Sequence, residues 1–432
     1  MKYVFYFLCL VPIWVGAASP LRVEVSGKAA ILVNAETGAV LWEKNAHTLL
    51  FPASTTKMIT ALYAVEKKGH DLDTMVTASY DAVMTISPAA RRSLNGNHPP
   101  YRLEYGGTHM GIKVDETLPL RALLYGLMLA SGNDAANVIA EHVSGSVLNF
   151  MEELNAYVRS KGCENTLLYT PHGLPCEEHK TTAFDLAILA REFLKNGFLR
   201  QVVKSVQYPR PQTNKQPESI LVQHNALVKP GKPFFYPKAI GIKTGYISAG
   251  GYTLVSAAED ENRRLIAVIL GCDRVEQRYT DAIALFEAGF NEKKVFRTLF
   301  SKGFDLFTHS VQGGEAPLQA YLSDDVFLEY YPSEEPVFTT AVFWQPPALP
   351  IQRGQQVGEM QVVSQGKILI SAPLYAAKPV QATFLHRMSL VGHRIKAELW
   401  GHLTLVMASM GIFVLAGSFY YSYKRSKRQL SD

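Results

Sequence analysis

Ser54 and Lys57 are a serine and a lysine whose types and spacing suit nucleophilic catalysis. A helix is expected over residues 54–68, where apolar residues recur at helical spacing. Residues i and i+3 share a helix face, so the lysine amine can reach the serine hydroxyl. A serine hydroxyl is a poor nucleophile, and a lysine whose pKa is lowered in a dry site can take its proton. The pair alone is weak evidence for a catalytic site, because an N-cap serine beside a solvated lysine gives the same pattern.

Two further motifs follow along the chain. Ser131, Gly132 and Asn133 come after an apolar helical pattern, where the alternative interpretation is an ordinary helix C-cap. Lys243, Thr244 and Gly245 stand at the start of an expected strand, where the alternative is an edge strand with a protective lysine.

The three motifs in this order resemble the signature of penicillin-binding proteins and class A β-lactamases. With Ser-Gly-Asn as the second motif, the chain is similar to the low-molecular-mass penicillin-binding proteins, the serine-type D-alanyl-D-alanine carboxypeptidases. The resemblance continues in the sequence phrases at residues 169–174 and 278–282 and covers about residues 25–290.

The resemblance implies a catalytic role for four residues. Ser54 would form the acyl-enzyme, and Lys57 would be its general base. Ser131 and Asn133 would relay a proton and bind the peptide backbone.

It also implies how substrate is held. Lys243 and Thr244 would bind the terminal carboxylate, with Arg278 as a more remote partner, and Gly245 would let the strand approach closely. The oxyanion hole would consist of the backbone N–H groups of the nucleophile and of Tyr246.

The expected reaction is removal of the terminal D-alanine from peptidoglycan stem peptides, with covalent binding of β-lactam antibiotics. D,D-endopeptidase or weak transpeptidase activity on peptidoglycan crosslinks would use the same motifs. A non-catalytic peptidoglycan-binding scaffold is disfavoured, because it would not need Ser54, Lys57 and Lys243 together. No metal or cofactor is expected. The four cysteines include no C-x-x-C pair, which disfavours a structural zinc site.

The surrounding elements predict an α+β fold. Hairpins are expected at residues 28–44 and 251–272, with helical patterns between them and a last helix at 278–290. Strands at both ends of the domain with helices between them favour an antiparallel sheet covered by helices, as in the β-lactamase and transpeptidase fold, over a doubly wound parallel sheet. Residues 85–112 and 208–238 are expected as loops, and residues 293–385 as a small all-β domain.

Composition and the two chain ends bear on location. Of 432 residues, 43 are basic and 38 acidic, a surplus too small and too dispersed for nucleic-acid binding. Residues 1–18 have the pattern of a secretory signal peptide. The uncharged stretch 403–423, followed by a basic cluster, predicts a transmembrane helix with a cytoplasmic tail at 424–432. The expected location is the inner membrane, with the catalytic domain on the periplasmic side.

Overall fold

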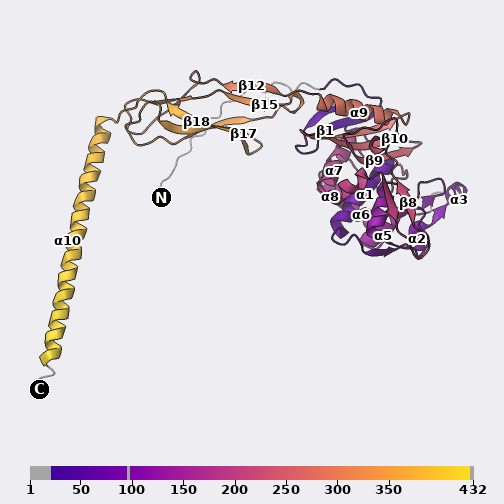
Figure 1. Cartoon of the computed structure of the whole chain (residues 1–432), viewed down its shortest axis with the longest axis horizontal. Coiled ribbons are helices and arrows are strands. Elements are labelled where there is room, and N and C mark those ends of the chain that lie inside the picture. The colour runs from indigo at the N-terminus through magenta and orange to yellow at the C-terminus, as the bar shows by residue number, and fades with distance from the viewer. Residues whose placement is uncertain (1–20, 95–97, 429–432) are drawn as a thin grey trace. The chain divides into compact units, whose positions relative to one another are not determined.

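The computed structural model describes residues 21–94 and 98–428, which form two compact units (Figure 1). The N-terminal unit runs to Lys294 and also includes the short segment Tyr331–Glu335. The C-terminal unit comprises Val295–Tyr330 and the chain from Pro336 onward. The expected signal peptide at 1–18 lies outside the described residues, as does the end of the tail, 429–432.

The N-terminal unit is built on a five-stranded antiparallel sheet in the order β2-β1-β11-β10-β9. Its strands are β1 Ala29–Asn34, β2 Val40–Lys44, β9 Ala239–Ile247, β10 Gly251–Glu259 and β11 Arg264–Cys272. Strands from the two ends of the domain therefore pair with each other, and the antiparallel sheet predicted from the sequence is confirmed.

The inner strand β1 explains why the sheet lies between helices. In β1, Ile31 and Val33 pack into the core on one face, and Ala30 and Leu32 pack into the core on the other. A strand buried on both faces reads as a continuous apolar run rather than an alternating one. The sequence AAILVN of β1 has this character, so helices must cover both faces.

Helices cover the two faces of the sheet unequally (Figure 1). Helix α9, Gln277–Phe290, packs on β10 and β11 from one side. The larger core on the other side is built by α1 Thr56–Lys68, α4 Leu120–Met128, α5 Asn133–Ser144, α6 Val147–Ser160, α7 Ala183–Lys195 and α8 Gly197–Lys204.

The helical pattern expected over residues 118–143 is interrupted. Helix α4 stops at Met128, and α5 starts at Asn133, after a turn in which Ser131 has φ +58°. A left-handed backbone conformation cannot continue a right-handed helix, so the second motif lies in the break.

The expected loops contain short elements. These are β3 Met75–Thr77, α2 Tyr80–Val83, β4 Thr85–Ile86, α3 Pro88–Ser93, β5 Leu103–Glu104, β6 Thr117–Pro119, β7 Gln207–Arg210, β8 Ser219–Val222 and η2 Ala226–Val228. None exceeds six residues, which is too short for a periodic pattern to reveal them.

The segment Tyr331–Glu335 is fastened to the N-terminal unit by polar contacts. It contains η3, Pro332–Glu334. Glu334 pairs with the buried Arg263 at 3.1 Å, and the Arg263 guanidinium lies 3.7 Å from the ring centroid of Tyr331. The Ser333 hydroxyl donates to Glu292 at 2.6 Å, and Glu292 also pairs with Arg263.

The C-terminal unit begins with two antiparallel sheets. Strand β12, Val295–Phe300, pairs with β15, Val326–Tyr330. The larger sheet has the order β13-β14-β18-β17-β16, with β13 Leu306–His309, β14 Leu318–Leu322, β16 Thr339–Trp344, β17 Gln356–Ser364 and β18 Lys367–Ala376. The all-β character expected of this part of the chain is confirmed.

The chain ends in helix α10, Phe384–Arg428, which is 45 residues long. Arg387 fixes its first turn by donating to the Ala382 carbonyl at 2.8 Å. Within it, Glu398–Ser422 is long and apolar enough to cross a membrane, and its side chains are exposed.

Candidate active site

Ser54 lies where the chain leaves the sheet and enters helix α1. A 3-10 turn, η1 Ala53–Thr55, carries it, and the Thr55 hydroxyl and the Thr253 hydroxyl both donate to the Pro52 carbonyl, at 2.7 and 3.1 Å. Ala53, directly before the serine, has φ +51°, which is uncommon for a residue with a Cβ. Such backbone strain persists only where the surroundings fix it, and it gathers at functional sites.

Lys57 is fully buried beneath Ser54, and the structure gives its amine three acceptors. Nζ lies 2.8 Å from Ser54 Oγ, 2.7 Å from Asn133 Oδ1 and 2.7 Å from the His172 carbonyl oxygen. A protonated lysine has three N–H donors, and each finds one of these oxygens. A neutral amine has two donors and one lone pair, so Asn133 and His172 can keep their hydrogen bonds while the serine hydroxyl donates to Nζ. The site therefore accommodates both protonation states without moving a heavy atom.

The environment of Lys57 favours the neutral amine. Burial lowers the pKa of Lys57 well below its usual range, and the positive charge of Lys243 lowers it further, while Asp134 acts in the opposite direction. Burial is the cause of a low pKa that the sequence analysis expects, and the predicted reach of Lys57 to Ser54 is also present.

The turn between α4 and α5 brings Ser131 and Asn133 to the same place. The Thr108 hydroxyl donates to the Ser131 carbonyl at 2.7 Å, and the Asn133 N–H donates to the Thr108 carbonyl at 2.8 Å. Asp134 is buried just behind the turn and accepts hydrogen bonds from the backbone N–H groups of residues 110, 111 and 112, at 2.8–3.0 Å. It thereby fixes the loop that forms this wall.

Strand β9 forms the opposite wall and runs past the nucleophile at close range. Its residues Thr244 and Gly245 pair with Leu254 and Thr253 of β10. A Cβ built on Gly245 would lie 2.9 Å from the backbone nitrogen of Ser54, closer than real Cβ contacts. Glycine is therefore needed here for the approach of the strand, which is the role that the resemblance implies for Gly245.

Two basic residues, Lys243 and Arg278, lie at the far side of strand β9. Lys243 is buried, and Arg278 of α9 donates to the Gly245 carbonyl at 2.9 Å and to the Tyr279 hydroxyl at 2.9 Å. Burial, with a smaller contribution from Arg278, lowers the pKa of Lys243 to about 7. A bound carboxylate would offset this desolvation of the cations.

A cavity of about 550 Å³ lies between these walls. Seven of the nine predicted site residues line it: Ser54, Ser131, Asn133, Thr244, Gly245, Tyr246 and Arg278. Lys57 and Lys243 do not line it but are buried directly behind lining residues, where their amines contact Ser54 Oγ and, at 3.0 Å, the Thr244 carbonyl.

Several lining residues were not singled out from the sequence. His224 lines the cavity from the connection after β8, and its N–H donates to the Leu129 carbonyl near the Ser131 turn. Partial burial and the charges of Lys243, Lys229 and Lys57 lower the pKa of His224. Glu104 and Thr108 line it from the expected loop at 85–112. No local pattern marks these residues, because only the tertiary fold brings them to the site.

The ring of His172 is held by two backbone groups behind the site. Its ring is fully buried, with Nε2 3.1 Å from the Tyr101 carbonyl oxygen and Nδ1 accepting from the Leu174 N–H at 3.1 Å. Burial lowers its pKa well below the usual range, and the charge of Lys57 acts in the same direction. The imidazole stabilises a loop rather than facing the cavity.

The three free thiols described are Cys163, Cys176 and Cys272. The spacing of Cys163 and Cys176 in the sequence permits a disulfide, and the structure shows these two thiols unbridged. Burial raises the pKa of Cys163 to about 12, so this thiol stays protonated.

A serine activated by a buried lysine, facing a Lys-Thr-Gly strand across a cleft, defines the class of serine acyl-transfer enzymes that includes the penicillin-binding proteins. Residues 15–274 match the family model described as D-alanyl-D-alanine carboxypeptidase, and residues 296–382 match penicillin-binding protein 5, C-terminal domain. The chain therefore belongs to the D-alanyl-D-alanine carboxypeptidases, the low-molecular-mass penicillin-binding proteins. The predicted family, fold class and serine peptidase activity on peptidoglycan are confirmed.

Named relatives agree with this assignment. The D-alanyl-D-alanine carboxypeptidase DacF of Bacillus subtilis is 29% identical over 368 residues, which covers 83% of this chain and 88% of the relative. The crystal structure of penicillin binding protein 5 from Haemophilus influenzae matches 85% of this chain and 100% of its own, at 25% identity and a TM-score of 0.55. The Streptomyces K15 DD-transpeptidase matches 62% of this chain and 98% of its own, at 26% identity and a TM-score of 0.53.

Proposed function

We propose that this enzyme removes the terminal D-alanine of peptidoglycan stem peptides through an acyl-enzyme on Ser54. The observation that carries the proposal is the 2.8 Å contact between Lys57 Nζ and Ser54 Oγ in a site where burial disfavours the ammonium. A general base must lie within hydrogen-bond reach of the proton it takes, and Lys57 meets this condition in a site whose burial favours the neutral amine.

The first half-reaction transfers the acyl group to the enzyme. Ser54 Oγ attacks the carbonyl carbon of the penultimate D-alanine as its proton passes to Lys57 Nζ. The C–N bond then breaks, and the leaving amine of the terminal D-alanine takes up one proton, carried from Lys57 through Ser131. In the second half-reaction a water molecule attacks the ester, its proton returns through the same groups, and the shortened peptide leaves with Ser54 restored.

The substrate is held from both walls of the cavity. Lys243, Thr244 and Arg278 would bind the terminal carboxylate, which explains why two cations are buried at one end of the site. Asn133 would fix the peptide backbone of the substrate. The N–H groups of Ser54 and Tyr246 would stabilise the oxyanion, a role that needs only the backbone of the exposed Tyr246.

A β-lactam should enter the same reaction, because its strained amide and carboxylate imitate the D-alanyl-D-alanine terminus. Intact-mass analysis after incubation with penicillin should show one adduct on the enzyme and none on Ser54→Ala. An adduct that survives this substitution would move the nucleophile to another residue.

A second candidate function is D,D-endopeptidase or weak transpeptidase activity, which the likeness to a DD-transpeptidase structure supports. Incubation with a pentapeptide and, separately, with a crosslinked muropeptide dimer tests both, with products identified by mass spectrometry. Loss of one alanine from the pentapeptide alone supports the carboxypeptidase. Cleavage of the dimer, or joining of two peptides, supports the second candidate.

We also propose that residues 403–423 span the inner membrane. An apolar helix of about 20 residues is about 30 Å long, which matches the hydrocarbon core. A signal peptide at 1–18 would export the catalytic domain, 25–290, and the β domain, 293–385, to the periplasmic side and leave residues 424–432 in the cytoplasm. Carbonate should then fail to extract the protein, and a cysteine at Ser431 should resist impermeant thiol reagents in intact cells. Labelling of that cysteine from outside would favour a helix lying on the surface.

A further inference from the structure

Strand β18 in the C-terminal unit is longer than the strand beside it. On one side it pairs with β17 along its whole length, from Lys367 to Tyr375. On the other side β14 pairs only with its last residues, Leu374 to Ala376. Within the described part of the chain, residues 367–373 therefore have no partner strand on that second side.

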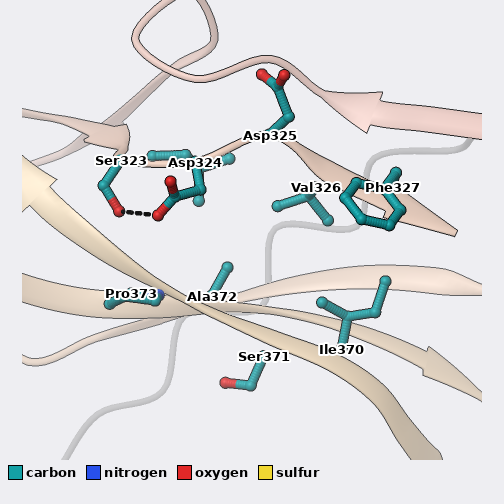
Figure 2. Close-up of a pocket in the computed structure, with 10 residues that line it drawn as sticks. Ser323, Asp324, Asp325, Val326, Phe327, Ile370, Ser371, Ala372 and Pro373 are labelled. Atoms are coloured by element: carbon teal, nitrogen blue, oxygen red, sulfur yellow. Dashed lines mark hydrogen bonds between the residues drawn. The ribbon is translucent and has the colours of Figure 1, made fainter.

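The chain that leaves β14 turns away from this edge. After Leu322 it passes through Ser323, Asp324 and Asp325 and enters β15, which pairs with β12 and not with β18. Figure 2 shows the result: Val326 and Phe327 lie on one side of a groove, and residues 370–373 of β18 lie on the other. The groove has a volume of about 310 Å³.

An unpaired edge of this length presents backbone donors and acceptors to any passing strand. Natural edges are usually protected by lysine, proline or bulges. Here Lys367 and Pro373 protect only the two ends, and the five residues between them carry no charge. Apolar side chains near this edge are also accessible: 58% of Ile368, at the start of the free edge, and 53% of Phe327, which lines the groove, are exposed.

The charged side chains that line the groove are acidic. Asp324 and Asp325 are the charged residues among the described lining of the groove. Asp324 accepts from the Ser323 hydroxyl, as Figure 2 shows, and Asp325 accepts from the Lys302 backbone N–H at 2.8 Å. Two carboxylates without a basic neighbour among the lining residues favour a cationic group on whatever enters.

We infer that an extended segment of a partner protein, apolar along its length and with a lysine or arginine near Asp324 and Asp325, adds as a strand to residues 368–372 of β18. In this mode of recognition, main-chain hydrogen bonds supply affinity, and alternate side chains supply specificity. Five extended residues span about 17 Å.

The occupant is a single segment rather than a second copy of this chain. A second β18 is flanked by its own β17 and β14, and the wall that carries Val326 and Phe327 stands opposite the free edge. A folded sheet cannot enter a groove walled on both sides, whereas an isolated extended peptide can.

The test uses the full-length protein in detergent and a displayed library of random heptapeptides. Three proteins are compared: the wild type, Ile368→Lys and Val337→Lys. Val337 is the matched control, since it is an exposed β-branched residue of the same unit, with 67% of its surface accessible, and it belongs neither to the free edge of β18 nor to the groove lining. Acylation by a fluorescent penicillin shows that each variant is folded.

The wild type and Val337→Lys should enrich the same peptides, rich in β-branched residues with a terminal lysine or arginine. Ile368→Lys should bind these peptides at least about tenfold more weakly, because it adds charge to the apolar edge and repels the basic residue. Asp324→Asn should relax the preference for a basic residue.

A chemical control separates strand addition from simple apolar contact. An enriched peptide is synthesised in two forms, N-methylated on its odd or on its even residues, so that one set of N–H donors is removed in each. At least one form should lose binding. The inference is overturned if both forms bind as the parent does, if Ile368→Lys enriches the same peptides as the wild type, or if the wild type enriches none. It is also overturned if the wild type dimerises and Ile368→Lys abolishes the dimer, because the occupant would then be a second copy.

Discussion

Replacing Gly245 by alanine should damage acylation much more than folding. The added Cβ would lie 2.4 Å from the Thr253 hydroxyl oxygen, 2.9 Å from the Ser54 backbone nitrogen and 3.1 Å from the Ala53 Cβ. None of these atoms is the end of a flexible side chain, since Thr253 is held to the Pro52 carbonyl and the other two belong to the strained turn that carries the nucleophile. Strand β9 or the turn must therefore shift.

The expected magnitudes follow from that geometry. Overpacking a tight site costs about 1–3 kcal/mol of the free energy of unfolding. A domain stable by about 5–15 kcal/mol remains folded after that loss. The same shift displaces the Ser54 N–H from the position of the oxyanion, and loss of one such donor reduces the rate by about 10²- to 10³-fold.

The assay is the second-order rate of acylation by a fluorescent penicillin, with the melting temperature measured on the same samples. Gly197→Ala is the control, because a Cβ at Gly197, the first residue of α8, meets no atom within 4 Å. It should leave the acylation rate unchanged and should not lower the melting temperature. Acylation of Gly245→Ala within about threefold of the wild type would refute the close approach of β9 to the oxyanion position.

Three further outcomes are expected. In Lys57→Arg the arginine keeps the positive charge but cannot deprotonate at working pH, so the rate of acylation by fluorescent penicillin should fall by about 10²-fold or more. Near-wild-type acylation would assign the base to another residue. The pKa of Lys243 is lowered to about 7, so this lysine loses its charge as the pH rises through that value. At pH values above about 7, KM for a pentapeptide should therefore increase while kcat changes little. A KM that stays constant across this pH range would contradict the assigned role. Asp134→Ala leaves three buried or partly buried N–H groups of residues 110–112 without their acceptor. Chemical denaturation should therefore show that the free energy of unfolding falls by about 3 kcal/mol or more. A fall below about 1 kcal/mol would show that the loop is held by other contacts.

The first catalytic motif could be predicted because it depends on local geometry, whereas the other two were indicated by the family resemblance. Ser54 and Lys57 share a helix face whatever the rest of the fold does, and their 2.8 Å contact follows from that spacing. The antiparallel sheet could also be predicted, because the apolar runs that form β1 and β11 stand at opposite ends of the domain sequence.

Other features depend on contacts between distant segments, which sequence patterns do not reveal. His224 reaches the cavity only because its N–H is held by Leu129, 95 residues earlier in the chain. The positive φ of Ser131 ends a helix that the apolar pattern would continue, and it is fixed by Thr108 from another loop. The free edge of β18 arises because β14 is shorter than its neighbour, a property of pairing and not of composition.

The segment Tyr331–Glu335 has a consequence for proteolysis of the intact protein. The chain leaves the N-terminal unit at Lys294, forms strands of the other unit, and returns with a segment that the buried Arg263 and Glu292 hold by ion pairing and hydrogen bonding. A protease that cuts within Val295–Tyr330 would therefore sever the backbone once and still leave Tyr331–Glu335 docked on the N-terminal unit. Release of the active enzyme from its C-terminal helix requires a cut after Glu335. A cut within Val295–Tyr330 would instead give two fragments on a denaturing gel that remain associated in solution.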